Sequence, residues 1–187
     1  MELMVTVALA AVLMGLGVPA FREFTQNGRL TGAANEMLMT IIATRNEAVR
    51  RQTTVSFCPS ADPGSDTATC DDDATAGYIS FIDTNASCDV DADEEVVANF
   101  TIHSEVKSDV NATCVSFAPT GFRRVVAGQP TTALAIFCDS RGLNMIASAD
   151  VTYARGVEIL PTGRAAVSRV YSELTTWGSA ADPVSCP

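Results

Sequence analysis

Met1–Phe21, MELMVTVALAAVLMGLGVPAF, is the stretch that decides how this chain is organised. Its last 19 residues, Leu3–Phe21, carry no charge, and an α-helix needs about 20 apolar residues to cross the hydrocarbon core of a bilayer. Glu2 stands at the edge of this apolar run. Because an ionised carboxylate is costly in hydrocarbon unless it is paired, Glu2 is a candidate functional residue.

Two other interpretations of the apolar stretch remain open. One is a cleaved secretory signal, for which Val18-Pro19-Ala20 is a passable cleavage site. The charge pattern argues against it, because the residues before the apolar run include Glu2 and neither Lys nor Arg. The other is a plain membrane anchor without a further role, which hydropathy alone does not distinguish.

The next stretch, Arg22–Arg51, continues the helix. Its apolar residues recur at steps of three and four, which places them on one helical face: Leu30, Ala34, Met37, Leu38, Ile41, Ile42, Ala48 and Val49. That face predicts packing against a C-terminal domain. An unbroken helix from Glu2 to Arg51 would be about 75 Å long at 1.5 Å per residue, and Pro19 predicts a kink in it because proline removes a backbone hydrogen bond.

Beyond Gln52 the pattern changes to short β-strands separated by turns. The predicted strands are Thr53–Phe57, Gly77–Asp83, Val96–His103, Thr113–Ala118, Arg123–Val126, Ala133–Cys138, Met145–Ala147, Gly156–Leu160 and Ala165–Tyr171. One helix followed by many short strands predicts an α+β protein with antiparallel sheets. We therefore divide the chain into a transmembrane helix half (1–21), an amphipathic helix half (22–52) and a β-rich globular domain (53–187).

Charge is unevenly distributed. The formal net charge is -10, and the segment from Asp62 to Asp109 holds 13 acids against one base, whereas Val110–Pro187 holds six Arg against five acids. This acidity argues against broad nucleic-acid binding. The chain has a single His, His103, and lacks a recognisable catalytic or zinc motif, so we expect neither an enzyme nor a resident cofactor.

The acidic segment raises the question of calcium. Asp89, Asp91 and Asp93 have the spacing found at the start of an EF-hand loop, but Glu94 stands where that loop needs Gly and Phe100 where it needs Glu. The segment is therefore not an EF-hand. An irregular calcium site of oxygen ligands at these three residues stays open, and we expect no other metal site.

All six cysteines follow the helix: Cys58, Cys70, Cys88, Cys114, Cys138 and Cys186. This placement predicts a domain exported to an oxidising compartment and cross-linked by up to three disulfides. Six cysteines allow 15 pairings, among which sequence alone does not choose. We favour Cys58–Cys70, Cys88–Cys114 and Cys138–Cys186.

The N-terminus, Glu2-Leu-Met-Val-Thr-Val-Ala followed by Pro19-Ala-Phe21, resembles that of type IV pilins and pseudopilins. In that superfamily a prepilin peptidase removes a basic leader, the new N-terminal residue is methylated, and a Glu follows shortly after. If Glu2 is that Glu, this sequence lacks the leader and the first residues of the mature chain, and Met1 is an internal residue. The resemblance implies that Glu2 neutralises the N-terminal amine of a neighbouring subunit.

Further landmarks resemble the GspH/FimT family of minor pilins and pseudopilins. They follow one another in the order expected of that family over nearly the whole chain: Arg45-Asn-Glu-Ala-Val49, Val55-Ser-Phe-Cys58, Gly77–Asp83, Phe117-Ala-Pro-Thr-Gly121, Phe137-Cys-Asp-Ser-Arg-Gly142 and Gly163-Arg164. The fold implied is a long N-terminal helix packed on a β-sheet domain of the pilin type.

This resemblance implies a minor pilin that takes part in initiating type IV pilus assembly at the filament tip. The subunit would span the bacterial inner membrane once, with its domain in the periplasm, and then enter the surface filament. Its expected partners are other minor pilins, the major pilin, the prepilin peptidase and the inner-membrane assembly platform. The alternative within the family is a type II secretion pseudopilin.

A third alternative is a minor pilin that binds DNA for natural transformation. Some FimT proteins carry a C-terminal Gly-Arg-x-Arg stretch implicated in phosphate contacts, whereas this chain has Gly163-Arg-Ala-Ala166. The second Arg of that stretch is missing, although Arg155 and Arg169 lie nearby in sequence. Arginine binds phosphate well, so Arg155, Arg164 and Arg169 are the candidate contacts.

Overall fold

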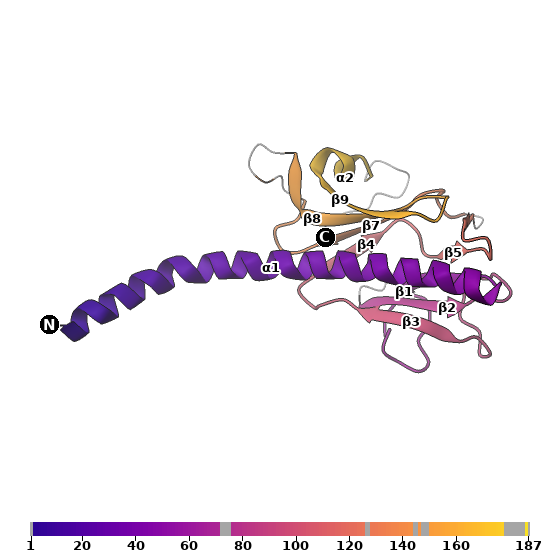
Figure 1. Ribbon diagram of the computed structural model, residues 1–187, viewed down its shortest axis with the longest axis horizontal. Helices are drawn as coiled ribbons and strands as arrows, with labels where there is room; N and C mark the ends of the chain where they lie inside the picture. The colour runs from indigo at the N-terminus through magenta and orange to yellow at the C-terminus, as the bar shows by residue number, and fades with distance from the viewer. Residues whose placement is uncertain are drawn as a thin grey trace.

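The computed structural model describes residues 2–71, 76–125, 128–143, 146, 150–177 and 186; the side chains of Glu2 and Leu16 lie outside this description. Within these residues a long helix packs against two antiparallel sheets (Figure 1). The elements in chain order are α1 (Glu2–Arg51), β1 (Val55–Ser60), β2 (Gly77–Ile82), β3 (Val96–Thr101), β4 (Lys107–Val110), β5 (Val115–Phe117), β6 (Arg123–Arg124), β7 (Ala133–Cys138), β8 (Val151–Ile159), β9 (Ala165–Val170) and α2 (Tyr171–Trp177).

Helix α1 has two halves with different surroundings. Its first half projects from the domain, and its second half lies along both sheets (Figure 1). The helix remains continuous through Pro19, and Figure 1 shows a gradual curve rather than a break in the projecting half. In the packed half, most of the apolar face expected from the sequence is buried, with Leu30, Ala34 and Ile41 fully inaccessible. Ile42 and Val49 were wrongly placed on that face, since each is 43% exposed.

The two sheets have different strand orders. The first sheet has the order β3-β2-β1-β5-β6 and the second has the order β4-β7-β8-β9. In the first sheet, β1 occupies the centre, where Val55 pairs with Ile82 of β2 on one side and with Phe117 of β5 on the other. In the second sheet, β7 lies between β4 and β8. Every pairing between these strands is antiparallel.

The main hydrophobic core lies between α1 and the sheets. Phe57 stacks on Tyr78 with ring centroids 5.2 Å apart, and Tyr78 stacks on Phe100 at the same separation. Burial raises the pKa of the Tyr78 phenol, because the phenolate would have to lose its hydration. A smaller core, which includes Ile136 and Leu174, lies between the second sheet and α2. Strand β7 is buried along its whole length because both of its faces are covered.

The α+β fold class and most of the strands are as predicted, with two differences among the described strands. Strand β4 was missed because Lys-Ser-Asp-Val has little local β character and is held by pairing with β7. Strand β8 begins at Val151 rather than at Gly156. A bulge between these two residues interrupts the pairing of β8 with β9. The strand expected at Met145–Ala147 lies largely outside the described residues.

Helix α2 is a further difference, since the sequence pattern predicted a strand up to Tyr171 and no helix after it. Its N-terminus is capped by a residue distant in sequence: Asp150 Oδ1 accepts a hydrogen bond from the Ser172 backbone N–H at 2.9 Å. Its Leu174 is fully buried against the second sheet. Such a short helix depends on tertiary packing, which local propensity does not reveal.

The six cysteines form the three disulfides favoured in the sequence analysis. Cys58 is bonded to Cys70, Cys88 to Cys114 and Cys138 to Cys186, with Cα–Cα distances of 5.6, 6.0 and 5.8 Å. The first disulfide fixes the loop after β1, the second joins the acidic loop to the start of β5, and the third ties the end of the chain to β7. Each therefore fastens an irregular segment to the sheets.

Candidate assembly interface

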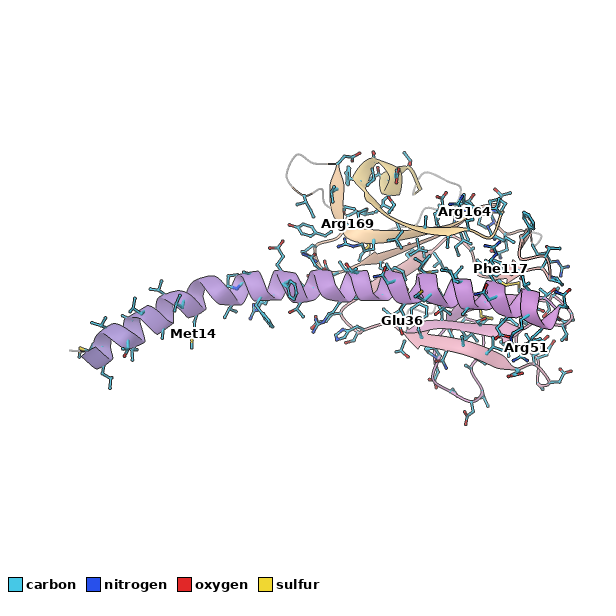
Figure 2. The ribbon with its side chains drawn as sticks, in the orientation of Figure 1. Met14, Glu36, Arg51, Phe117, Arg164 and Arg169 are labelled. Atoms are coloured by element: carbon cyan, nitrogen blue, oxygen red, sulfur yellow. A yellow bond between two sulfur atoms is a disulfide. The ribbon has the colours of Figure 1, made fainter. Side chains whose placement is uncertain are left out.

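The projecting half of α1 exposes a large apolar surface. Among the described residues, α1 is long and apolar enough to cross a membrane, and none of its apolar window is buried within the protein. Leu3, Met14 and Phe24 are 77%, 68% and 75% exposed, and Figure 2 shows Met14 pointing away from the helix with nothing beside it. An apolar surface of this length is compatible with membrane anchoring or with packing against other helices.

Three contacts fix the C-terminal end of α1 to the domain. Thr44 Oγ1 donates to Ser80 Oγ in β2 at 2.9 Å, and both side chains are fully buried. Arg45 Nε donates to the Gly121 carbonyl oxygen at 2.8 Å. Arg51 forms an exposed ion pair with Glu95 at 2.9 Å. These contacts determine the rotation of α1 about its axis and therefore which residues of the projecting half face each direction.

Two glycines make the contact with Arg45 possible. Gly121 has a φ of +78° and Gly163 has a φ of +76°, a region that L side chains rarely adopt. A Cβ at Gly163 would overlap the Gly121 carbonyl oxygen and lie 3.3 Å from Arg45 Nε. The structure therefore brings together three of the landmarks on which the family resemblance rests, from α1, the β5–β6 turn and the β8–β9 turn.

A second group of contacts holds α1 at the point where it leaves the domain. Arg141 Nη2 donates to Asn27 Oδ1 of α1 at 3.0 Å, and the same guanidinium pairs with the Asp139 carboxylate. The guanidinium carbon also lies 4.1 Å from the centroid of the Tyr153 ring. Burial acts to raise the pKa of Asp139, but hydrogen bonds and charge from Arg141 outweigh it, so that this pKa is lowered.

The sequence pattern did not indicate that Asn27, Asp139 and Arg141 form a connected group. The signal was available in part, because Asp139 and Arg141 belong to the Phe137–Gly142 landmark. Their contact with Asn27 joins residues 114 positions apart in the chain. No periodicity or local motif indicates such a contact.

The three arginines proposed for phosphate binding do not form one patch. Arg155 is only 4% exposed, and its Nη1 donates to the carbonyl oxygens of Tyr153 and Ala154 within the β8 bulge. Burial and the nearby charges of Arg169 and Arg141 lower the pKa of Arg155 to about 10. Arg164 and Arg169 are exposed but lie toward opposite ends of β9 (Figure 2). Arg155 thus stabilises the bulge, while the other two are far apart.

The three aspartates considered for calcium lie in a loop held by its own hydrogen bonds. Asp91 Oδ2 accepts from Asn85 Nδ2 at 2.7 Å, and Glu94 Oε1 accepts from the Thr84 backbone N–H at 2.8 Å. Within the part of the chain that the structure describes, no three carboxylate, His or Cys side chains are grouped as metal ligands. Asp89, Asp91 and Asp93 are not gathered around one point.

Comparison with known proteins identifies the family. The family model described as type II transport protein GspH matches residues 33–163, which run from the packed half of α1 to Gly163 and exceed half of the chain. No curated protein sequence matches significantly.

Two solved structures are similar in arrangement. The type IV minor pilin FimU of Pseudomonas aeruginosa (strain PAO1) has 17% sequence identity over 80% of this chain and 94% of its own, with a TM-score of 0.49. The minor pseudopilin EpsH from the type 2 secretion system of Vibrio cholerae has 9% identity over 75% of this chain and 97% of its own, with a TM-score of 0.48. The extent of the family match is decisive: the chain belongs to the GspH family of type II transport proteins.

Proposed function

We propose that this protein is a minor pilin that helps to start the assembly of a type IV pilus, with a structural rather than a catalytic role. The observation that supports the proposal is the contrast between the two halves of α1. One half is fixed to a disulfide-linked domain, and the other half offers an unburied apolar surface. A subunit of this shape is suited to join others through its helix while its domain stays in water.

In this proposal the precursor spans the bacterial inner membrane once through 3–21, with its domain in the periplasm. Assembly transfers the apolar helix from lipid to a bundle of neighbouring helices, so the apolar surface stays covered in both states. The partners are other minor pilins, the major pilin, the prepilin peptidase and the inner-membrane assembly platform. Family membership and the exposed apolar helix both support this course.

Glu2 has the central chemical role in the proposal. Its side chain lies outside the described part of the structure, and it is the first residue of α1. In this proposal, that end of the helix lies in the membrane. A carboxylate there pairs with the N-terminal amine of the neighbouring subunit. Opposite charges attract strongly in a medium of low dielectric constant, so the pair would favour correct register between helices.

A second function is favoured by a specific finding, the family description itself, which names a type II transport protein. In that case the same subunit would join a short periplasmic filament that drives secretion of folded proteins. The helix and its attachment to the domain serve either filament equally. The two functions differ in which major subunit takes up this protein.

Deletion of the gene separates the two. The amount of major pilin sheared from the cell surface is measured in the deletion strain and after complementation with the gene carrying its upstream leader. Loss of surface pili that complementation restores is expected for a pilus-initiating subunit. Unchanged pili together with a loss of secreted proteins would refute that role in favour of the secretion filament.

A further inference from the structure

The tripeptide Asn-x-Ser/Thr, in which x is any residue except Pro, is the acceptor sequence for N-linked glycosylation of exported proteins. It occurs three times in this chain, at Asn85-Ala-Ser87, Asn99-Phe-Thr101 and Asn111-Ala-Thr113. None of the roles assigned above involves these three asparagines. Because so short a motif also arises by chance, only the surroundings of each asparagine indicate whether a glycosyl transferase can use it.

Asn85 lies in the exposed loop between β2 and β3, in a turn that its own side chain closes. Its Oδ1 accepts a hydrogen bond from the Ser87 backbone N–H at 2.9 Å, and its Nδ2 donates one to Asp91 Oδ2 at 2.7 Å. Ala86, between Asn85 and Ser87, has a positive φ of +59°, so the chain turns sharply at this point. Asn85 and Ser87 are both exposed. The amide and the hydroxyl of this motif are therefore accessible together.

The two hydrogen bonds of the Asn85 amide also favour its reaction. An amide nitrogen is a weak nucleophile, and it becomes a better one as its N–H proton is withdrawn by a base. A donor on the amide oxygen and a carboxylate on the amide N–H both make that proton more acidic. Because a carboxylate is a stronger acceptor than water, the turn holds Asn85 closer to its reactive form than a freely hydrated amide.

Asn99 is exposed as well, but it belongs to strand β3. The amide and the hydroxyl of its motif are two residues apart in an extended strand, or about 6.6 Å along the chain at 3.3 Å per residue. Bending the motif into a turn would break the pairing of Asn99 with Ile79. It would also remove Phe100, which is 3% exposed, from its stack on Tyr78, at a cost of about 1.5–3 kcal/mol. The folded strand therefore protects Asn99.

Asn111 is not accessible. It is only 9% exposed, its Oδ1 accepts from the Leu134 backbone N–H at 2.7 Å, and its Nδ2 donates to the Thr132 carbonyl oxygen at 3.3 Å. The Thr113 hydroxyl of the same motif accepts from Gln129 Nε2 at 2.6 Å. Both groups that a transferase has to recognise are thus used in holding the segment after β4 to the segment that leads into β7.

We propose that Asn85 is an acceptor for N-linked glycosylation in the folded protein and that Asn99 and Asn111 are not. The Asn85 amide nitrogen attacks the anomeric carbon of an oligosaccharide carried on a polyprenyl pyrophosphate. A C–N bond forms, the C–O bond to the pyrophosphate breaks with its electron pair on the leaving pyrophosphate, and the amide proton passes to a base of the transferase. The inference rests on the proposed function in one respect, because the domain has to reach the periplasm, where such donors are presented.

The loop lies near the C-terminal end of α1, away from the projecting half of the helix (Figure 1). The backbone N–H of Asp83, just before the loop, donates to the carbonyl oxygen of Thr54, just beyond α1, at 3.0 Å. At the other end of the loop, Glu95 pairs with Arg51 of α1. A glycan on Asn85 would cover this acidic loop and leave the apolar half of α1 free to pack against other helices.

The test uses the purified full chain, folded and oxidised in detergent. It is incubated with a single-subunit oligosaccharyltransferase that requires only Asn-x-Ser/Thr and with an N-acetylhexosamine disaccharide linked to polyprenyl pyrophosphate. Intact mass spectrometry should show the addition of one disaccharide, and peptide mapping should locate it on Asn85. Asn85→Gln should remove the signal. Ser87→Ala should lower the initial rate by more than about a hundredfold, because a site that hydrogen-bonds a hydroxyl rejects an acceptor without one, and Ser87→Thr should retain the rate.

Two controls test the role of the fold. Asn99→Gln removes an exposed asparagine of the same motif and should leave the modification unchanged. A chain that has been reduced and alkylated in urea and then diluted into the assay should accept the disaccharide at all three asparagines. An unmodified folded protein, modification of Asn99 or Asn111 in the folded protein at the rate of Asn85, or modification of Asn85 alone in the unfolded chain would each overturn the proposal.

A parallel measurement in cells separates this inference from the proposed function. The gene with its upstream leader is expressed in cells that carry the same transferase and donor in the periplasm, and the protein is mapped again. Modification of Asn85 in both settings is expected. Modification in vitro but not in cells would overturn the periplasmic placement of the domain and the proposed function with it, whereas failure in vitro would overturn only the acceptor site.

Discussion

Arg45 of α1 and Gly121 of the β5–β6 turn are joined by a 2.8 Å hydrogen bond across 76 residues of sequence. Gly163 lies against the same carbonyl group, so close that a side chain there would displace it. This contact and the pair formed by Asn27 and Arg141 hold the packed half of α1 at its two ends. The direction in which the apolar half leaves the domain is fixed by these contacts.

Replacing Gly163 by Ala should destabilise the domain by about 2–4 kcal/mol, because it adds overpacking to the strain of a positive φ. Gly142→Ala is the matched control, since Gly142 also has a positive φ of +66° but open space around its Cα. That variant should lose only about 1 kcal/mol. Urea unfolding of the full chain in detergent measures both, and equal losses would show that the close approach to Gly121 is unimportant.

Removing the disulfides one at a time should destabilise the domain in the order of the loops they close. The sequence separations are 12 for Cys58–Cys70, 26 for Cys88–Cys114 and 48 for Cys138–Cys186. Chain-entropy arguments predict losses that rise from about 3 to about 4 kcal/mol along this series. Paired Cys→Ala variants and thermal unfolding test the order. An unchanged melting temperature for any pair would mean that its bond adds nothing to stability.

Acid should weaken the attachment of α1 through Asp139. Its pKa is lowered from 3.8 in the folded protein, so the stability supplied by its pair with Arg141 is fully present above about pH 5 and is lost as pH falls through the lowered pKa. Asp139→Asn should lower the free energy of unfolding by about 1–3 kcal/mol at pH 7. In this variant the free energy of unfolding should decline less as the pH falls toward 2.5.

Glu95→Gln serves as the comparison for Asp139→Asn, since it removes an ion pair whose side chains are much more exposed. It should change the free energy of unfolding by less than about 1 kcal/mol. Urea unfolding at a series of pH values gives the free energy of unfolding of both variants as a function of pH. An Asp139→Asn profile that runs parallel to that of the unmodified protein would rule out this contribution to the pH dependence.

Glu2→Gln should prevent incorporation into filaments while the domain remains folded, because the uncharged amide cannot neutralise the amine of a neighbouring subunit. Glu23→Gln is the matched control, an exposed acid just beyond the apolar run. Immunoblots of sheared filaments measure incorporation, and near-ultraviolet circular dichroism of the purified protein checks folding. Normal incorporation of the Glu2 variant would refute the pairing role.

Duplex DNA should not be retarded by this protein in a gel-shift assay at physiological salt. The chain carries a net charge of -10, and Arg155 is buried, while Arg164 and Arg169 lie toward opposite ends of β9. A shift that disappears in Arg164→Ala and persists in the control Arg124→Ala would contradict this expectation. It would then support a role in DNA uptake.

The sequence pattern correctly predicted the helices and strands that depend mainly on residues close together in the chain. The apolar face from Leu30 to Ile41 repeats every three or four residues, and the structure buries it as expected. Strands β2 and β7 were predicted because each is a short, largely apolar run bounded by turn residues. Strand β4 and helix α2 were missed, since the pairing with β7 and the cap from Asp150 involve distant residues.

The sequence by itself determined the long helix with an apolar half, the antiparallel β-rich domain and its family, because periodicity, apolar length and landmark order are properties of the chain. The disulfide pairing was one of 15 possibilities until the strands placed the sulfur atoms together. Only the tertiary structure brought Arg45 to Gly121 and buried Arg155. It also left Asn85 exposed and buried Asn111, although both belong to the same short motif. These features depend on how distant segments pack, and the burial and pairing of a charged or polar side chain follow from that packing.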